Sequence, residues 1–287
     1  MNMKSINVIV AGATGYIGLQ LIKLLTKHPF VNIKKIYAQK FIGKNISHFD
    51  KYFTKCRKLP KISLFNKKDL KNIDIVFTAL PDGEAQKISK NLNNFTKLID
   101  LSADFRLSNY KLYEKWYNKK HYAKSLIKNS IYSLPELVNK DLQKYKIIAC
   151  PGCYPTSIQI PIIPLINNKL IQTKNIIIDS KSGYSGAGKN LHKKFKYKNI
   201  YQSISAYGIG FHRHVSEIEQ EINKEAKKSI KIIFTPHLTP MFRGILSTIY
   251  LDLSKNITPK KIHNYLKKYY KNESFVKIKK FNIPIGT

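Results

Sequence analysis

Residues 6–18, INVIVAGATGYIG, join an apolar run to three glycines in the spacing G-x-x-G-x-x-G. A helical apolar pattern over residues 21–25 follows directly. Glycines in this spacing allow a tight turn, close approach of the backbone to a pyrophosphate, and close helix–strand packing. The strand before the glycines and the helix after them predict a dinucleotide-binding fold, in a variant common among NADP-linked enzymes. The predicted cofactor-binding residues here are Gly12, Thr14, Gly15, Tyr16, Ile17 and Gly18.

The second predicted strand, residues 33–38, ends where the adenosine ribose of a dinucleotide lies in such folds. An NAD site uses an acidic residue there to bind the 2′-hydroxyl group. This chain offers Lys40 and Lys44 instead, with no carboxylate before Asp50. Because cations suit a 2′-phosphate, we expect NADPH as the cofactor.

Two further apolar strands are predicted over residues 73–80 and 97–101. In an open α/β sheet, ligands bind beyond the carboxyl ends of the strands. Pro81 and Ser102 follow those ends, so we expect both to contact the cofactor. We therefore predict an N-terminal Rossmann domain over residues 1–150, built on a doubly wound parallel sheet.

Cys153 stands just beyond an apolar strand (residues 147–149) and at the start of a predicted helix. Unpaired backbone N–H groups and the helix dipole favour a thiolate at a helix N-terminus, and the thiolate is the nucleophilic form. Pro151 and Gly152 form a tight turn that leaves the backbone bare around the sulfur. We therefore predict that Cys153 forms a covalent intermediate such as a thioester, whereas Cys150 is inert.

The second predicted domain covers residues 151–287. Its first helix carries Pro161 and Pro164 and is therefore expected to be short or kinked. A predicted strand over residues 176–179 leads into a loop of small residues, where Gly186 lets the backbone approach a ligand and is expected to bind the cofactor. The later predicted elements are two strands typical of an antiparallel sheet (231–238 and 243–253), a polar helix (258–271) and a short strand (275–280).

His212 and His214 flank Arg213, which is one of only four arginines in this lysine-rich chain. Ser216 and Glu219 have the spacing of a capping box, which places the three residues in the loop before a helix. Two histidines at alternate positions of an extended segment point opposite ways, so we expect one at most to face the thiol. Together with a reactive cysteine elsewhere, the pair favours an active site.

The net charge of +34 raises the alternative of a basic nucleic-acid-binding protein. The positive residues are nearly all lysine, and they form no stripe and no arginine-rich arm. Compositional drift explains the charge more simply, so we expect no nucleic-acid partner. No metal is expected, because the cysteine and histidine spacings match no metal template. The lack of a long apolar run and of a paired cysteine framework predicts a cytoplasmic protein without a membrane partner.

Taken together, these segments resemble the N-acetyl-γ-glutamyl-phosphate reductases, a family of the semialdehyde dehydrogenase group. The resemblance runs the full length of the chain, and the cysteine motif combined with the His-Arg-His motif is highly specific. The segments that carry it are Gly12–Gly18, Leu101–Arg106, Pro151–Thr156, Ser182–Lys189, His212–His214 and Pro240–Gly244.

The resemblance implies an α/β chain, with a Rossmann domain followed by a glyceraldehyde-3-phosphate-dehydrogenase-like α+β catalytic domain. It implies reduction of N-acetyl-L-glutamyl 5-phosphate by NADPH to N-acetyl-L-glutamate 5-semialdehyde, with release of phosphate, in arginine biosynthesis. By motif, Cys153 is the nucleophile that holds the thioester, and His212 is the acid/base. The residues implied to position the acyl phosphate are His214, Glu217, Arg243 and Arg106.

The chain departs from the family pattern at two places that matter. Asp82 stands where the family usually has histidine, so the loop on the nicotinamide side differs. The chain stops at Thr287, where family members continue for several dozen residues that supply further strands and a helix. We therefore expect the catalytic domain to be C-terminally truncated.

Several alternatives stay open at this point. Two sister reductases use the same chemistry on aspartyl phosphate or on carrier-linked aminoadipyl phosphate. An inactive remnant is a third possibility, because the expected truncation would leave the catalytic domain incomplete. Enzymes of this kind often form symmetric assemblies, so we expect a homo-oligomer, either a dimer or a tetramer.

Overall fold

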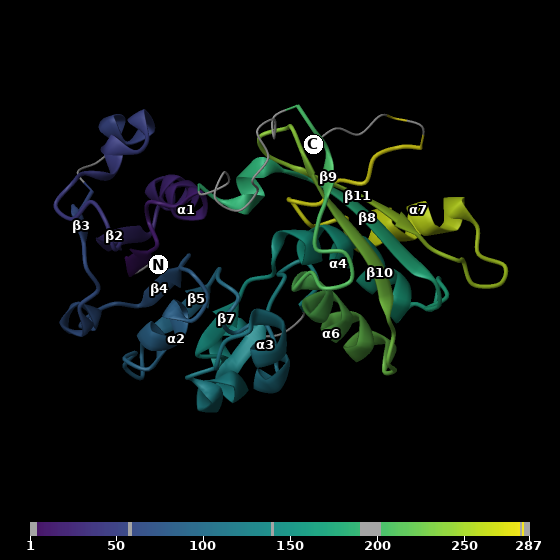
Figure 1. The fold of residues 1–287 in the computed structure, drawn as a ribbon, viewed down its shortest axis with the longest axis horizontal. Coiled ribbons are helices and arrows are strands. Elements are labelled where there is room, and N and C mark those ends of the chain that lie inside the picture. Colours follow the sequence, from purple (N-terminus) through teal and green to yellow (C-terminus); the bar gives the residue numbers. More distant parts are fainter. Residues whose placement is uncertain (1–4, 57–58, 139–140, 190–201, 282, 284–287) are drawn as a thin grey trace. The chain divides into compact units, whose positions relative to one another are not determined.

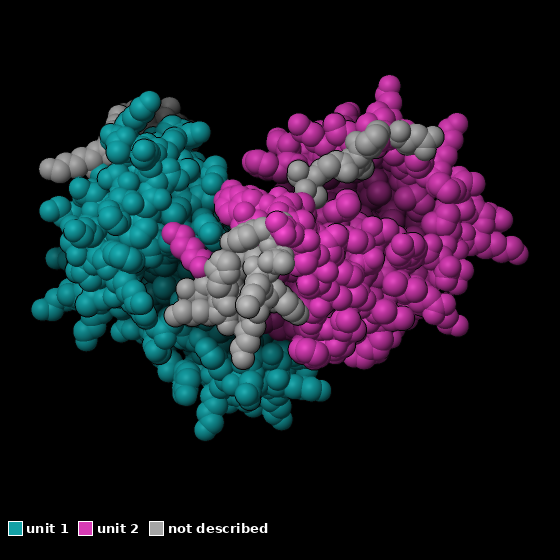
Figure 2. Space-filling view, turned by 45° about the horizontal axis from the view of Figure 1, so that its top comes forward, with its two compact units in different colours: residues 1–133, 141–150 teal, residues 134–140, 151–287 magenta. Residues whose placement is uncertain are grey.

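The computed structural model describes residues 5–56, 59–138, 141–189, 202–281 and 283. The chain divides into two compact units, drawn in teal and magenta in Figure 2. The first unit comprises residues 1–133 and 141–150, and the second comprises residues 134–140 and 151–287. Residues 134–140 thus cluster with the second unit, whereas our predicted boundary placed them in the first. The assignment of a cofactor role and a catalytic role to the two ranges stays a prediction.

The first unit is built on one seven-stranded sheet in which every strand pairing is parallel (Figure 1). The strand order is β3-β2-β1-β4-β5-β7-β6, so the sheet grows in both directions from β1 and reverses between β1 and β4. This confirms the predicted doubly wound sheet. The strands are β1 (Ile6–Ala11), β2 (Val31–Tyr37), β3 (Ile62–Ser63), β4 (Ile75–Thr78), β5 (Lys97–Asp100), β6 (Ser130–Tyr132) and β7 (Ile147–Ala149).

Helices cover this sheet because its interior strand β1 is apolar on both faces. Val8 and Val10 belong to one buried cluster, and Ile9 and Ala11 belong to another. Successive strand residues point to opposite faces, so an uninterrupted apolar run needs cover on both sides. The α-helices of the unit are α1 (Tyr16–Thr26), α2 (Glu84–Ser89) and α3 (Tyr110–Tyr117). Its 3₁₀ turns are Ile46–His48, Lys51–Lys55, Lys67–Leu70, Lys124–Asn129 and Leu142–Lys144.

The second unit contains a mixed four-stranded sheet in the order β11-β8-β10-β9. The strands are β8 (Ile176–Gly183), β9 (Ser205–Ala206), β10 (Ile232–Thr239) and β11 (Ile245–Tyr250). The helices are α4 (Cys153–Asn167), α6 (His214–Ala226) and α7 (Pro259–Tyr269), with a 3₁₀ turn at Tyr184–Ala187. None of the helices in the described part of the chain is long and apolar enough to cross a membrane.

Two sequence-based expectations for this sheet are wrong. The strands β10 and β11 do not pair with each other, because β8 lies between them and runs parallel to β10. Residues 275–280 form no strand, and the side chain of Phe275 is 93% exposed. Pairing with a distant strand is a property of the folded chain, which local alternation alone does not specify.

The first helix of this unit is not short, although it was expected to be short or kinked. Helix α4 runs without interruption for 15 residues through Pro161 and Pro164. Pro164 has no N–H, so the carbonyl of Ile160 loses its normal partner four residues along the helix. The Tyr270 hydroxyl donates a hydrogen bond to this carbonyl oxygen at 2.6 Å. A side chain from beyond α7 therefore supplies the donor that the proline removes.

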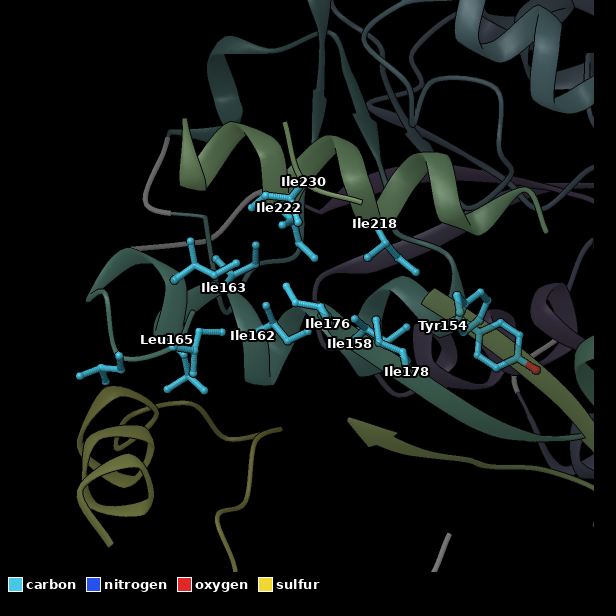
Figure 3. Close-up of a cluster of buried hydrophobic side chains, with 14 residues drawn as sticks. Tyr154, Ile158, Ile162, Ile163, Leu165, Ile176, Ile178, Ile218, Ile222 and Ile230 are labelled. Atoms are coloured by element: carbon cyan, nitrogen blue, oxygen red, sulfur yellow. The ribbon is translucent and has the colours of Figure 1, made fainter. Parts of the chain in front are cut away.

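The core of the second unit is a cluster of isoleucines shared by α4, α6 and β8 (Figure 3). Each buried isoleucine contributes about 1.5–3 kcal/mol relative to an exposed one. Tyr154 lies at one end of the cluster, with its hydroxyl pointing away from the isoleucines. The cluster thus fixes the helix starts at Cys153 and His214 relative to each other. The isoleucines of these three elements that Figure 3 labels are Ile158, Ile162 and Ile163 on α4, Ile218 and Ile222 on α6, and Ile176 and Ile178 on β8.

Candidate active site

Cys153 is the first residue of α4, and its side chain is exposed. Gly152 caps the helix and has no side chain that could bind the N–H groups of the first turn. The thiol therefore lies in the positive end of the helix dipole. Cys150 lies three residues earlier, and burial raises the pKa of its thiol to about 11, with the Asp100 carboxylate adding to the shift. Only Cys153 of these two has the environment of a nucleophile.

Glu217 anchors the backbone next to this thiol. Its side chain is fully buried in the first turn of α6, and Oε1 accepts a hydrogen bond from the Gly152 N–H at 2.7 Å. A carboxylate that accepts an N–H makes a short, strong hydrogen bond. The sequence analysis assigned Glu217 to the substrate, whereas this contact is to the protein backbone. The contact holds the residue before Cys153, and the predicted contact of Glu217 with the substrate stays a prediction.

The alternation rule predicted that His212 and His214 point in opposite directions, and this prediction is wrong. Their rings lie edge to face with centroids 4.9 Å apart, and both contact the Tyr154 ring. The reason is the backbone of Arg213, which is helical (φ −56°, ψ −28°) rather than extended. The chain turns between the two histidines, so both rings reach the same side.

The predicted capping box is also absent. Helix α6 begins at His214, which is buried, so this residue is not in the preceding loop. The Ser216 hydroxyl donates to the carbonyl of Arg213 instead of capping the helix. Glu219 turns to the next strand, where it pairs with Lys231 and accepts the Ile232 N–H. Ser216 is therefore bound within its own helical turn, and Glu219 is bound by tertiary partners.

The contacts of His212 define its protonation. Its Nδ1 accepts the main-chain N–H of His214 at 3.2 Å, so the proton of the neutral ring lies on Nε2. The rings of Tyr154, Tyr207 and Phe234 surround it, with centroids 5.5–5.6 Å away. Burial, helped by the positive charge of Arg213, lowers the pKa of His212 to about 4. At neutral pH this side chain is a neutral hydrogen-bond donor.

Tyr207 is a site residue that the sequence analysis missed. Its hydroxyl lies 3.0 Å from that of Tyr154. Burial raises the pKa of Tyr207, and the charge of Cys153 adds to this shift. The charge of Cys153 also raises the pKa of Tyr154, where burial is again the largest cause. The tyrosine pair therefore lies within electrostatic range of the sulfur. The sequence signal that could have identified Tyr207 was its position at the start of the Tyr-Gly-Ile-Gly stretch.

Gly186 and Arg243 lie on two loops that the backbone holds together. The Gly183 N–H donates to the Gly244 carbonyl at 2.9 Å, and a Cβ at Gly183 would lie 2.8 Å from the Arg243 nitrogen. The loop over residues 182–189 therefore packs directly against the turn over residues 240–244. Both Gly186 and Arg243 are exposed, and their predicted ligand roles stay predictions.

Arg106 and Ser102 are both buried in the first unit and bound to protein groups. The Arg106 guanidinium donates from Nε to the Cys150 carbonyl at 2.8 Å and from Nη2 to the Leu101 carbonyl at 3.0 Å. Ser102 donates from Oγ to Asp100 at 2.6 Å. Burial, with the nearby Asp104 charge, raises the pKa of Asp100 to about 6. Binding of substrate by Arg106 and of cofactor by Ser102 stays a prediction.

Asp104 is a second residue that the sequence analysis left without a role. Its carboxylate accepts the Gly83 N–H at 2.6 Å and the Tyr113 hydroxyl at 2.8 Å. It also accepts the Gln86 N–H, so it satisfies the start of α2 from outside that helix. Asp104, in the loop after β5, thus holds the backbone of the loop after β4 in place.

The glycine loop after β1 contains glycines of two kinds. Gly12 has φ +88°, and a Cβ there would collide with the Ala79 carbonyl; at Gly18 it would collide with the Gly12 carbonyl. Gly15 has an ordinary φ of −77°, and a Cβ there would meet only the Gly12 oxygen at 3.5 Å. Packing explains Gly12 and Gly18, whereas the open space at Gly15 fits the close approach of a pyrophosphate to the start of α1.

The other predicted cofactor residues of the first unit have accessible side chains. Thr14 and Tyr16 are half-buried. Those that are exposed are Ile17, Lys40, Lys44 and Pro81. Within the described ranges, no group of three or more histidine, cysteine, aspartate or glutamate side chains could hold a metal ion.

The fold, the glycine loop of the first unit and the residues around Cys153 and His212 in the second unit together define the class of protein as a semialdehyde dehydrogenase. Residues 7–145 match the model of the semialdehyde dehydrogenase NAD binding domain, and residues 153–285 match that of the semialdehyde dehydrogenase dimerisation domain. A crystal structure of aspartate semialdehyde dehydrogenase II from Vibrio cholerae has the same fold, with a TM-score of 0.66 at 15% sequence identity. That comparison covers 93% of this chain and 80% of the other.

Curated relatives narrow the class further. The chain is 41% identical over 274 residues to N-acetyl-gamma-glutamyl-phosphate reductase of Desulforamulus reducens, covering 95% of this chain and 79% of the relative. It is 41% identical over 275 residues to the probable chloroplastic N-acetyl-gamma-glutamyl-phosphate reductase of Arabidopsis thaliana, covering 96% of this chain and 68% of the relative. The chain belongs to the N-acetyl-γ-glutamyl-phosphate reductase family.

The state of His212 can be measured directly. We expect ¹⁵N NMR at pH 7 to show a neutral ring protonated at Nε2, with titration near pH 4 rather than near the ordinary value of about 6.5. Because the unfolded chain binds this proton more tightly, His212 should make the fold less stable as pH falls from about 6.5 towards 4. An Nδ1–H tautomer, or titration at 6.5 or above, would contradict the geometry.

The two kinds of glycine predict different outcomes for the same substitution. Gly15→Ala should change the free energy of unfolding by less than about 1 kcal/mol, because the added methyl group has space. It should weaken NADP⁺ binding at least tenfold, which corresponds to about 1.4 kcal/mol. Gly12→Ala, the matched control, should lose stability before any effect on binding can be measured. Calorimetric titration and denaturant unfolding separate the two, and unchanged NADP⁺ affinity in Gly15→Ala would contradict the prediction.

Proposed function

We propose that this chain reduces N-acetyl-L-glutamyl 5-phosphate with NADPH, giving N-acetyl-L-glutamate 5-semialdehyde and phosphate in arginine biosynthesis. One observation supports this above the others: an exposed cysteine begins a helix whose cap is anchored by Glu217, and the next residue, Tyr154, contacts the ring of the neutral His212, in a member of this family. An acyl phosphate is an activated substrate for a thiolate, and the resulting thioester accepts hydride, which a free carboxylate does not.

In this proposal Cys153 performs the covalent step. Its thiolate attacks the acyl carbon, the bond from that carbon to the phosphate oxygen breaks, and phosphate leaves with its electron pair. NADPH, when bound, supplies the hydride that reduces the thioester. Collapse of the reduced adduct then breaks the carbon–sulfur bond, which frees the aldehyde and regenerates the thiolate.

His212 holds a proton against the reacting oxygen. The reduced adduct carries a developing negative charge on oxygen, and the Nε2–H of the neutral imidazole donates a hydrogen bond to it; the proton stays with Nε2 when the carbon–sulfur bond breaks and that oxygen becomes the aldehyde carbonyl. The low pKa of His212 favours this role, because the ring keeps one proton on a known nitrogen over the whole neutral range. His212 is therefore the proposed acid/base, and the Tyr154–Tyr207 pair keeps its ring in place.

Four residues are proposed to position the acyl phosphate. Arg243 is exposed and suits a carboxylate or phosphate, because a guanidinium can bind either with two parallel hydrogen bonds. His214 lies beside His212, and Glu217 acts through the Gly152 amide. Arg106 holds the Cys150 carbonyl and so directs the chain towards the nucleophile. We also propose that Arg106 binds the phosphate or the carboxylate of the substrate.

The glycine loop fits NADPH as the cofactor. Gly15 leaves room for the pyrophosphate at the start of α1, where unpaired N–H groups bind anions. Lys40 and Lys44 are exposed cations beyond β2, which suits a 2′-phosphate. We place the enzyme in the cytoplasm, because its three cysteines are free.

We further propose a homo-oligomer assembled through the open face of the second unit's sheet. Ile177, Ile233 and Tyr250 share one register row on β8, β10 and β11, and all three are exposed. Asp179 in the next row is paired with Lys181 in the row after it, so these two charges of the face are already matched. An apolar row beside paired charges is suitable for face-to-face contact with a second copy. The dimerisation-domain match over residues 153–285 supports this.

The reaction can be assayed in reverse. We expect phosphate-dependent reduction of NADP⁺ with N-acetylglutamate semialdehyde, and a loss of at least about 1,000-fold in Cys153→Ser because the nucleophile is gone. Cys150→Ser is the matched control and should keep its activity. Turnover with aspartate semialdehyde alone would reject the substrate, and undiminished activity in Cys153→Ser would reject the covalent mechanism.

Oligomerisation has its own test. Ile233→Glu places a charge in the apolar row and should convert the oligomer to monomers in analytical ultracentrifugation. Leu64→Glu changes an equally exposed aliphatic residue in the first unit and should leave the assembly unchanged. A monomeric wild-type protein, or an unaltered oligomer in Ile233→Glu, would contradict this choice of interface.

A further inference from the structure

A hollow of about 780 Å³ lies in the second unit, at the end of α4 opposite to Cys153. Residues at the C-terminal ends of α4 and α6, and the segment leading to β8, form its wall. Helix α4 has 15 residues, so its two ends are roughly 20 Å apart at 1.5 Å per residue. The hollow is therefore separate from the site around Cys153 and His212, and its volume is typical of a small-molecule pocket.

The wall of the hollow is strongly positive. Lys169, Lys174, Lys227 and Lys228 line it, against the single carboxylate of Glu225. Across the part of the chain that the structure describes, none of these four ammonium groups forms an ion pair. Two helix C-termini contribute about half a negative charge each, so roughly two positive charges remain unbalanced. Helix capping alone does not account for the cluster.

The lysine-rich composition does not account for it either. Among the described residues, the non-glycine positions with positive φ include four asparagines and two lysines. Helix α3, for example, ends in Asn118, and asparagine is favoured in this left-handed conformation. The two lysines, Lys169 and Lys227, both have φ +53° and both line the hollow. The chain is rich in both asparagine and lysine, yet among the described left-handed positions lysine occurs only at the two that line the hollow.

We propose that this hollow binds an organic phosphate of nucleotide size that carries at least two negative charges. Lysine binds phosphate as a point charge, and four lysines around one hollow suit a chain of phosphates rather than one carboxylate. Ile166 and Ile171 are buried beneath the wall and give the hollow an apolar part that a bare inorganic ion would leave unused. The proposal does not depend on the proposed reaction, because it concerns the other ends of α4 and α6.

Binding of ATP without divalent cations tests the proposal by calorimetric titration at 0.15 M salt. The full chain is first saturated with NADP⁺, so that the first unit does not compete. The hollow variant combines Lys169→Asn, Lys227→Asn, Lys174→Gln and Lys228→Gln. Asparagine at the two left-handed positions keeps the helix ends stable, so this variant is expected to fold.

The control variant carries Lys260→Gln, Lys261→Gln, Lys267→Gln and Lys268→Gln on α7, which removes the same charge from exposed positions. We expect the hollow variant to bind ATP at least tenfold more weakly than wild type, and the control to stay within twofold. Equal weakening in both variants, or none in the hollow variant, would overturn the site. Inorganic triphosphate that binds as tightly as ATP would overturn the assignment to an organic ligand.

Discussion

One hydrogen bond, from the Gly152 amide to the buried carboxylate of Glu217, ties the start of α4 to the first turn of α6. A carboxylate is stable at full burial only when hydrogen bonds satisfy it, and a bond to a charged acceptor contributes roughly 1.5–3 kcal/mol. Cys153 follows Gly152 directly, and His214 lies one turn before Glu217. The same contact therefore sets the thiol and the two histidines relative to each other. The isoleucines of α4 and α6 hold the rest of both helices in that register.

The parallel sheet was predictable because its signals are local. The residues of β1 are apolar on both faces, and Gly12 occupies a left-handed position that other residues rarely adopt. The continuity of α4 was not predictable, because it depends on a donor far away in the sequence. Tyr270 lies 110 residues beyond the Ile160 carbonyl that it satisfies. The parallel pairing of β10 with β8 is non-local in the same way.

The residues of the site likewise divide into those with a local sequence signal and those whose arrangement depends on the folded chain. Cys153 could be found from a strand exit, a turn and a helix start, which are all adjacent in the sequence. The direction of the histidine rings could not, because it depends on one helical residue, Arg213, where an extended chain was expected. Tyr207 was missed because its partner hydroxyl belongs to Tyr154, 53 residues earlier. Asp104 was missed because a carboxylate in a loop gives no sign that it satisfies a neighbouring loop.

Two arginines of this lysine-rich chain, Arg106 and Arg213, show where charge alone is sufficient and where it is not. Arg106 reaches two carbonyls at once, 44 and 5 residues away in the sequence, from Nε and Nη2. An ammonium group has no planar fork with two fixed donors, so a lysine could not hold both carbonyls in this geometry. Arg213 differs, because its effect on the pKa of His212 is electrostatic and a lysine would produce it too. Hydrogen-bond geometry therefore matters more than charge at Arg106, and that geometry fixes the strand end from which the chain continues to Cys153.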